Sequence, residues 1–273
     1  MEATESKESS VVEINRERDG IALITLRRPA ALNAMNAALI AALHDAFATL
    51  RHDRSCRVII ITGEGKAFCA GLDLREGASP PEAAGLGRAQ AGLVVQQSIA
   101  TLVPTMRSMR QPIIAAVNGA ASGGGLALAL ASDIRVCSPA ARFNVAFVRI
   151  GLSGCDIGVS WLLPRLIGAS RAYQMMLTGR FVGAEEAERI GLVTTVSDDA
   201  VEAAIEQAEL LLANSPFGVH MTKEVMWSQL EIGSLQAGID LENRTQLLTT
   251  QTADLAEAMQ AFLEKRTPQF GDR

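Results

Sequence analysis

The chain has 273 residues, of which 48% are apolar and 20% charged, so it is long enough for one large domain or two small ones. Aromatic residues make up only 4%, against 23 glycines, which predicts a core of aliphatic side chains. The net charge of −5 argues against a nucleic-acid-binding protein, which needs a basic face to replace phosphate counterions. Most positive charge comes from arginine, and the scarce lysines are Lys7, Lys66, Lys223 and Lys265.

The cysteines and the amino-terminal residues favour a reduced, cytoplasmic protein with no membrane segment. Because no CxxC pair occurs, we expect neither a disulfide scaffold nor a metal site, but mostly buried thiols at Cys56, Cys69, Cys137 and Cys155. Residues 1–10 lack a basic region followed by an apolar run, which predicts a disordered tail and no secretory signal. The uncharged stretch 112–132 is as long as a membrane span, but its glycines, Asn118 and Ser122 favour a buried strand, a turn and a buried helix.

The first sixty residues change from strand spacing to helix spacing and back. Short β-type runs at 11–16 and 21–26 flank Asp19-Gly20, a dipeptide typical of hairpin turns. Apolar residues then recur at helical spacing as far as Leu50, with Asn33 as the predicted helix cap. The continuous apolar run at 58–62 predicts a strand that is buried on both faces of a sheet.

The rest of the chain alternates between strands and helices before it becomes wholly helical. Glycines and prolines at 75–90 predict a loop, followed by a helix at 89–109 that is kinked near Pro104. Further strands are predicted at 113–117, 134–137, 146–150 and 192–196. Further helices are predicted after the glycines at 123–125 and at 157–177, 183–190, 198–214, 217–232, 234–248 and 251–265. This alternation implies an α/β core with mostly parallel strands at 11–205, and a packed helical region at 206–273.

Two glycine-bearing turns follow predicted buried strands, at residues 63–73 and 118–125. Neither turn contains the Gly-Lys-Ser/Thr of a phosphate-binding loop, and neither matches GxGxxG. Turns of this kind expose backbone N–H groups, and two N–H groups that converge on one carbonyl oxygen stabilise a developing oxyanion. The alternative for either turn is simply tight packing between a strand and a helix.

Several runs resemble the enoyl-CoA hydratase/isomerase, or crotonase, superfamily, and the match is collinear from about residue 11 onward. The matching runs are Arg28-Pro29-Ala30-Ala31-Leu32-Asn33-Ala34-Met35, Lys66 to Leu74, Pro112 to Gly119, Gly123-Gly124-Gly125, Ser132-Asp133-Ile134-Arg135 and Leu177-Thr178-Gly179-Arg180. The resemblance implies an α/β spiral of ββα units, a carboxyl-terminal helical region that forms homotrimers or hexamers, and acyl-CoA thioester substrates. Coenzyme A would enter as part of the substrate, with no separate cofactor.

The same resemblance implies the residues of a site. The N–H groups of Leu72 and Gly124 would hold the thioester oxygen. Coenzyme A would lie near Ala31, Leu32, Ala70, Asp73 and Leu74, and would be reached by Phe262 and Lys265, often from a neighbouring subunit. A lysine that the family often carries after Arg28-Pro29 is replaced here by Ala30, so arginines would bind more of the anionic end.

The chain departs from the family at the two positions where hydratases carry glutamates that activate water. These positions hold Ala127 and Phe147, which cannot transfer a proton. The acid left nearby is Asp156, which resembles the proton-carrying aspartate of dienoyl-CoA isomerases, although a helix-capping role is equally open. Because one carboxylate is enough to move a proton between carbons of an enolate, the sequence favours isomerase-type chemistry over hydration.

Two other functions remain open at this point. A non-catalytic acyl-CoA-binding protein would also explain the missing glutamates. A serine hydrolase of the Clp type, which shares the crotonase spiral, would use Ser122, but no histidine follows it within the next 25 or so residues to act as its base.

Overall fold

The structure is a computed structural model that describes residues 10–272, so the predicted disordered tail lies outside the described residues except for Ser10. The chain begins with an antiparallel hairpin of β1 (Val12–Arg18) and β2 (Ile21–Leu26). The turn between them is the predicted Asp19-Gly20, and Gly20 has a φ of +86°. The hairpin was therefore predicted correctly, although β1 extends two residues further than expected.

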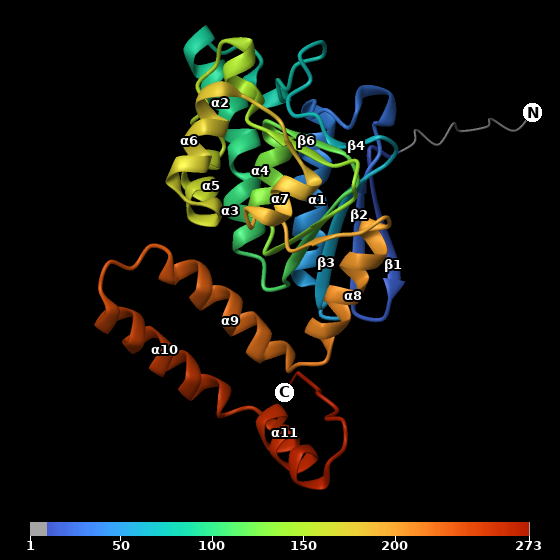
Figure 1. Ribbon diagram of the computed structural model, residues 1–273, viewed down its shortest axis with the longest axis vertical. Helices are drawn as coiled ribbons and strands as arrows, with labels where there is room; N and C mark the ends of the chain where they lie inside the picture. Colours follow the sequence, from blue (N-terminus) through green and yellow to red (C-terminus); the bar gives the residue numbers. More distant parts are fainter. Residues whose placement is uncertain (1–9, 273) are drawn as a thin grey trace, which may run out of the picture.

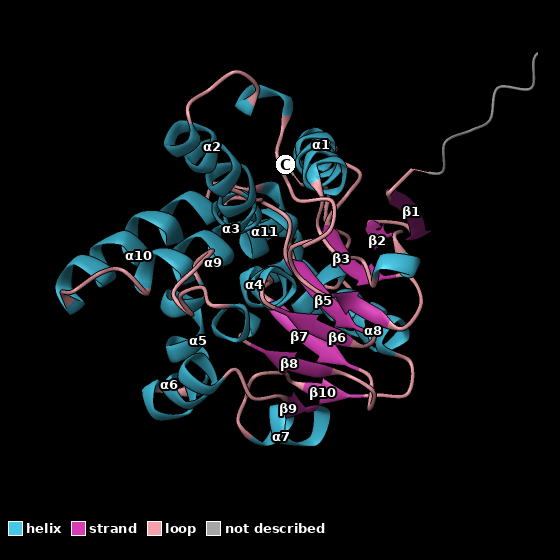
Figure 2. Ribbon diagram, turned by 90° about the horizontal axis from the view of Figure 1, so that it is seen from above, coloured by secondary structure: helices cyan, strands magenta, loops and turns pink. Residues whose placement is uncertain are grey.

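Paired strands then wind into a spiral. One sheet has six strands in the order β1-β2-β3-β5-β7-β10, and the other has four in the order β4-β6-β8-β9 (Figure 2). In the pairs β3/β4, β5/β6 and β7/β8 the first strand belongs to the six-stranded sheet and the second to the four-stranded sheet, and in the pair β9/β10 this order is reversed. The strands are β3 (Val58–Gly63), β4 (Ala67–Cys69), β5 (Ile113–Val117), β6 (Ala120–Ser122), β7 (Ile134–Cys137), β8 (Arg142–Asn144), β9 (Val182–Gly183) and β10 (Thr195–Val196). Only the β1–β2 and β8–β9 pairings within these two sheets are antiparallel. This arrangement confirms the predicted α/β spiral.

Helices surround this pair of sheets and fill the last third of the chain (Figure 1). They are α1 (Ala37–His52), α2 (Arg88–Ala100), α3 (Leu102–Arg107), α4 (Gly124–Ala131), α5 (Val159–Ile167), α6 (Ala169–Thr178), α7 (Ala184–Arg189), α8 (Ala200–Leu212), α9 (Pro216–Gln229), α10 (Leu235–Thr249) and α11 (Ala253–Glu264). In Figure 1 the helices α9, α10 and α11 lie below the spiral rather than around it.

The buried strands of the large sheet alternate their side chains between two cores. Ile59 and Ile61 of β3 face the core formed with α1, α3 and α4, while Val58 and Ile60 face the core formed with α8. This explains why β3 is a continuous apolar run. The predicted boundary at residue 205 falls within α8, which packs on the sheet, so the helical arm of the structure begins at Pro216.

The predicted cap at Asn33 is wrong, because Asn36 caps α1 by accepting a hydrogen bond from the N–H of Leu39. Asn33 is instead fully buried at a φ of +54°, a conformation that asparagine tolerates better than most residues. Its amide group donates to the carbonyls of Glu64 and Ala67 and accepts from the N–H of Arg28. Asn33 therefore holds the loop before α1 against the loop after β3.

Two predicted helices are each two helices in the structure. The helix predicted at 89–109 breaks at Thr101, because Pro104 lies in the first turn of α3 and has no N–H to donate to the preceding turn. The helix predicted at 157–177 is divided by Gly168, which has a φ of +81°.

Two predicted strands are also wrong in type or length. The apolar run at 146–150 is a 3₁₀ helix that begins just after β8 ends. Its Phe147 side chain is buried, which accounts for the apolar character of the run. Of the strand predicted at 192–196, only Thr195–Val196 pairs with β7. The short strands β4, β6 and β8 were not predicted, since three residues are too few to show a period.

A buried ion pair joins the arm to the spiral. Lys223 of α9 lies 2.8 Å from the Asp133 carboxylate and donates to the carbonyls of Met106 and Gln111. Asp133 also accepts from the N–H of Ile113 and from the indole of Trp227. Burial lowers the pKa of Lys223, and the adjacent Asp133 opposes that shift. With every polar partner satisfied, the pair fixes α9 to the amino end of β5.

The structure also shows the state of the cysteines, the length of the apolar helices and the grouping of possible metal ligands. Cys56, Cys69 and Cys137 are buried free thiols, as expected, whereas Cys155 is exposed. No helix within residues 10–272 combines the length and the apolar composition needed to cross a bilayer. In the same part of the chain, no three or more His, Cys, Asp or Glu side chains gather where they could hold a metal ion.

Candidate active site

The two glycine turns predicted from the sequence meet in the structure. Strand β4 pairs in parallel with β6, which brings residues 70–73 against residues 122–125. A Cβ atom added at Gly71 would lie 2.8 Å from the Ser122 carbonyl oxygen and 3.3 Å from the Gly124 nitrogen. A Cβ atom added at Gly125 would lie 2.0 Å from the Cys69 carbonyl oxygen. Glycine is therefore required for the two backbones to approach this closely.

Two backbone N–H groups remain free at this junction. Met35 donates to the Gly71 carbonyl at 2.7 Å and accepts from the N–H of Asp73 at 3.0 Å, so the N–H of Leu72 points away from Met35. Gly124 is the first residue of α4, where an N–H has no acceptor within the helix. Neither N–H finds a hydrogen-bond acceptor within residues 10–272. Backbone donors without an internal acceptor are the kind of group that can stabilise an oxygen that gains negative charge.

The walls around these donors are apolar. A Cβ atom added at Gly124 would lie 2.2 Å from Met35 Cε and 3.5 Å from Ile157 Cδ1, and one added at Gly123 would lie 3.3 Å from Phe147 Cε1. Ala127 is buried in the same helix as Gly124. Ala127 and Phe147, the positions to which the family resemblance assigns the hydratase glutamates, hold side chains that release no proton.

Asp156 is the carboxylate next to this wall. It directly precedes Ile157, and its Oδ1 accepts from the N–H of Ile157 at 2.8 Å and from the side chain of Gln96 in α2. The capping role considered for Asp156 is wrong, because the residue that caps α5 is Gly158. Oδ2 of the half-buried Asp156 has no hydrogen-bond donor within residues 10–272. One oxygen is oriented and the other is available to exchange a proton.

Four of the five residues predicted near coenzyme A lie on two loops that are held together. The loop before α1 contains Ala31 and Leu32, and the loop after β4 contains Ala70 and Leu74. The N–H of Ala70 donates to the Leu32 carbonyl at 3.0 Å, and both leucine side chains are exposed. Exposed apolar side chains on a rigid loop pair suit contact with the flat face of a purine base.

The fifth residue, Asp73, has its carboxylate fully engaged within the protein. It accepts from the N–H groups of Arg75 and Glu76 and from the guanidinium of Arg28. The backbone N–H groups of Glu76 and Arg75 lower its pKa most, with a smaller effect from Arg28. Arg28 also pairs with Glu76 at 2.7 Å, so one guanidinium closes the loop that carries the Leu72 N–H. Asp73 and Arg28 hold the loop in shape, and the direct contact to coenzyme A stays a prediction.

Phe262 and Lys265 are not brought to this site within one chain. Phe262 lies on α11 and is 83% exposed, and Lys265 follows at the end of that helix. In Figure 1 α11 lies at the opposite end of the molecule from β4 and β6. If these residues reach coenzyme A, they do so from another subunit.

Two further residues near the site, Ser122 and Arg149, can also be placed. Ser122 lies in β6 opposite Asn144 of β8, and no histidine within residues 10–272 hydrogen-bonds to it. Arg149 lies with its guanidinium 5.6 Å from the Phe181 ring centre. Sequence reasoning missed Arg28 and Gln96, although Arg28 was part of a recognised run. Gln96 gave no signal, because its contact with Asp156 spans 60 residues.

Comparison with known proteins identifies the family of the chain. A model of the family described as enoyl-CoA hydratase/isomerase matches residues 16–273. The chain is 41% identical over 266 residues to the probable enoyl-CoA hydratase echA12 of Mycobacterium bovis, covering 96% of this chain and 93% of that protein. A probable enoyl-CoA hydratase/isomerase of Mycobacterium abscessus has a crystal structure with a TM-score of 0.90 and 40% identity, covering 97% of this chain and 99% of that one. A monofunctional enoyl CoA isomerase from M. smegmatis has a TM-score of 0.72 and 40% identity, covering 85% and 99%.

The spiral of paired strands and the junction of two amide-bearing turns define a crotonase-fold protein. The chain belongs to the enoyl-CoA hydratase/isomerase family, whose members are enzymes that act on coenzyme A thioesters.

Proposed function

We propose that the protein is an enoyl-CoA isomerase that moves a carbon–carbon double bond by proton transfer through Asp156. The N–H groups of Leu72 and Gly124 bind the thioester carbonyl oxygen and stabilise the enolate. Asp156 removes a proton from C2 of a 3-enoyl thioester, which gives a dienolate, and returns that proton to C4. The product is the 2-enoyl thioester, with no net gain or loss of atoms. The step needs no separate cofactor, because one carboxylate both takes and returns the proton.

The observation that carries this proposal is the apolar character of the side chains around the N–H groups of Leu72 and Gly124. By the family resemblance, Ala127 and Phe147 replace the two glutamates that hydration needs, and Asp156 directly precedes Ile157, whose side chain packs near Gly124. An apolar wall also excludes the water that a hydratase must bind and activate. The likeness to the monofunctional isomerase from M. smegmatis supports the same choice, whereas the name of the M. bovis relative favours hydration.

The test is to compare two reactions and one substitution. The wild-type protein should convert a 3-enoyl-CoA to the conjugated 2-enoyl-CoA, followed by ultraviolet absorbance, and should hydrate a 2-enoyl-CoA far more slowly. Asp156→Asn should lower the isomerisation kcat by about 10²–10⁴-fold and leave coenzyme A affinity nearly unchanged. Asp45→Asn, an exposed aspartate on α1, is the matched control and should keep full activity.

Other outcomes select the alternatives. Equal kcat in the wild type and Asp156→Asn contradicts the role of Asp156. Tight coenzyme A binding with no turnover of any thioester supports a non-catalytic binding protein. Covalent labelling of Ser122 by a fluorophosphonate supports a serine hydrolase.

We also propose that the site is completed in a homotrimer, or in a hexamer made of two trimers. The exposed apolar side chains of the arm support this, because they leave a large apolar surface that a neighbouring chain can cover. They include Met226, Leu235, Leu247, Leu248, Met259, Phe262 and Leu263. In this assembly Lys265 binds the anionic end of coenzyme A at the neighbour's site. Lys265→Gln should then raise KM severalfold with little change in kcat, and light scattering should give a trimer or hexamer mass.

A further inference from the structure

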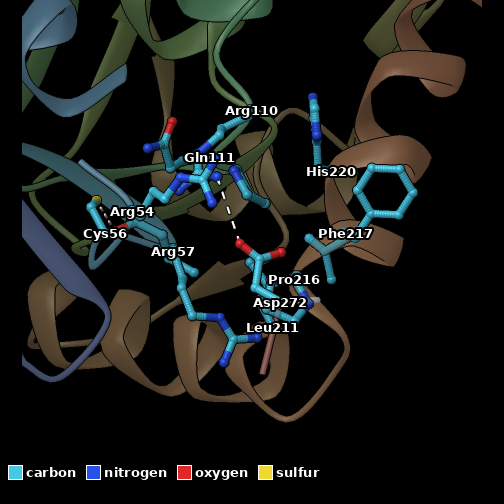
Figure 3. Close-up of a pocket in the computed structure, with 13 residues that line it drawn as sticks. Arg54, Cys56, Arg57, Arg110, Gln111, Leu211, Pro216, Phe217, His220 and Asp272 are labelled. Carbon is cyan, nitrogen blue, oxygen red and sulfur yellow. Dashed lines mark hydrogen bonds and ion pairs between the residues drawn. The ribbon is translucent and has the colours of Figure 1, made fainter. Parts of the chain in front are cut away.

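A small pocket lined by three arginines lies at the opposite end of the spiral from the candidate active site. Arg54 and Arg57 come from the turn before β3, and Arg110 comes from the segment before β5. Helix α9 and the carboxyl-terminal segment close the other side (Figure 3). The cavity volume is about 80 Å³, several times the ~10–15 Å³ that one water molecule needs on the same measure. It has room for one small oxyanion.

The positive charge of this pocket is only partly neutralised. Arg57 donates to the Asn214 carbonyl at 2.6 Å, but its Nε is buried without an acceptor in the described part of the chain. Arg110 donates a long hydrogen bond of 3.4 Å to the backbone carbonyl of Asp53. Arg54 forms no hydrogen bond or ion pair with any of residues 10–272. Three guanidinium groups therefore keep donors that have no strong acceptor.

Among residues 10–272, Asp272 supplies the one carboxylate that lines the pocket, and it binds weakly. Figure 3 shows the Asp272 carboxylate directed toward Arg110, where an oxygen lies 3.8 Å from Nη1. This distance allows an ion pair but no direct hydrogen bond. The Asp53 carboxylate nearby is already taken by Arg16 and by Ser55. Asp272 is thus a weak internal anion in a site that has a surplus of cationic donors.

We propose that this pocket binds a tetrahedral phosphate-type oxyanion, which displaces the Asp272 carboxylate. Guanidinium groups suit this ligand because their N–H donors match the spacing of two phosphate oxygens. A bound oxyanion connects the loops before β3 and β5 with the start of α9, which is where the helical arm joins the spiral. Binding here therefore stabilises the attachment of the arm without touching the residues of the candidate active site. The proposal does not depend on the isomerase function.

The experiment is a titration of the full-length protein with inorganic phosphate, followed by calorimetry and by the thermal midpoint Tm. Potassium chloride at matched ionic strength corrects for general screening. Phosphate should raise Tm above the chloride control. Arg57→Gln and Arg110→Gln should each weaken phosphate binding by about tenfold, because each removes a charge-assisted donor. Asp272→Asn should tighten binding severalfold, because it removes the competing anion.

Arg171→Gln, an exposed arginine on α6, is the matched control and should bind phosphate as the wild type does. Arg54→Gln serves if the more buried Arg57→Gln does not fold. Adenosine 3′,5′-bisphosphate distinguishes a free phosphate from the phosphoryl group of a larger ligand: tighter, Arg57-dependent binding of the bisphosphate selects the larger ligand. The proposal is overturned if phosphate raises Tm no more than chloride does. It is equally overturned if Asp272→Asn leaves phosphate affinity unchanged.

Discussion

The two ends of the six-stranded sheet differ in their polar groups: backbone N–H groups at one end and charged side chains at the other. At the carboxyl ends of β3 and β5, glycine turns present the backbone N–H groups of Leu72 and Gly124 among apolar walls. At the amino ends of the same strands, charged side chains predominate: the Lys223–Asp133 pair holds α9, and three arginines line a pocket.

The candidate catalytic groups and the groups that hold the helical arm therefore lie at opposite ends of the sheet. Backbone donors carry no conformational freedom of their own, so their position depends on how closely the turns approach, and glycines set that distance. Charged side chains at the other end hold the helical arm against the spiral through interactions that depend on burial and pairing. Substitutions at the carboxyl end should therefore change rates, and substitutions at the amino end should change stability.

Removing one partner of the buried ion pair should give the largest effect, and it should fall on stability. Lys223→Ala leaves the buried Asp133 carboxylate without its cation, which typically costs about 3–5 kcal/mol. Urea unfolding followed by circular dichroism measures this loss. The kcat of the folded fraction should stay close to that of the wild type, since the pair lies at the amino end of the sheet.

A double variant shows whether the cost comes from the unpaired charge. Lys223→Met combined with Asp133→Asn removes both charges and keeps one of the two acceptor oxygens that bind the N–H of Ile113 and the Trp227 indole. Its loss of stability should be smaller than that of Lys223→Ala. A double variant as unstable as the sum of the two single variants would contradict this account.

Gly71→Ala should give the next largest effect, and it should fall on kcat. The added Cβ meets the Ser122 carbonyl oxygen at 2.8 Å, and the φ of +94° is unfavourable for alanine. The turn must then shift and move the Leu72 N–H, and loss of one oxyanion donor lowers kcat by about 10²–10³-fold. Gly77→Ala is the control, since it also has a positive φ but nothing within 4 Å. If both variants lose activity equally, backbone strain rather than the approach of the turns is responsible.

The contrast between the two ends also explains what the sequence could predict. The hairpin, the buried strands and most helices follow from local spacing, which the chain displays within ten or twenty residues. The free amides at Leu72 and Gly124 were located through the resemblance of whole runs to a family, because composition alone shows only that two glycine turns exist. Their meeting depends on the β4–β6 pairing, and strands of three residues carry no readable period.

The parts that sequence reasoning missed depend on contacts between distant segments. Asn33 looked like a helix cap because it precedes an apolar periodic run, but its side chain is used by Glu64 and Ala67 about thirty residues away. The charge clusters at the amino end combine residues from the turns before β3 and β5, from α9 and from the last residues of the chain. No local pattern connects such residues.

Asp73 gives a smaller, pH-dependent effect at the carboxyl end. Its pKa is held below the ordinary value of 3.8 in the folded protein, so it adds stability above that pH and loses it as the pH falls toward its lowered pKa. Asp73→Asn should therefore be less stable than the wild type at pH 7, and the gap should shrink below about pH 4. Urea midpoints at several pH values measure it. A gap that stays constant down to pH 3 would show that the carboxylate charge does not matter.

Thiol labelling should give the smallest effect, and it tests whether the segment around Asp156 belongs to the carboxyl-end site. Cys155 is exposed, whereas burial raises the pKa of Cys69 and of Cys137 to about 12, so at neutral pH a thiol reagent should modify one cysteine rapidly. Cys155→Ser should abolish that rapid phase. Because Cys155 directly precedes Asp156, a bound acyl-CoA should slow its labelling a few-fold, while phosphate, which we place at the amino end, should not. Protection by phosphate but not by acyl-CoA would reverse the assignment of the two ends.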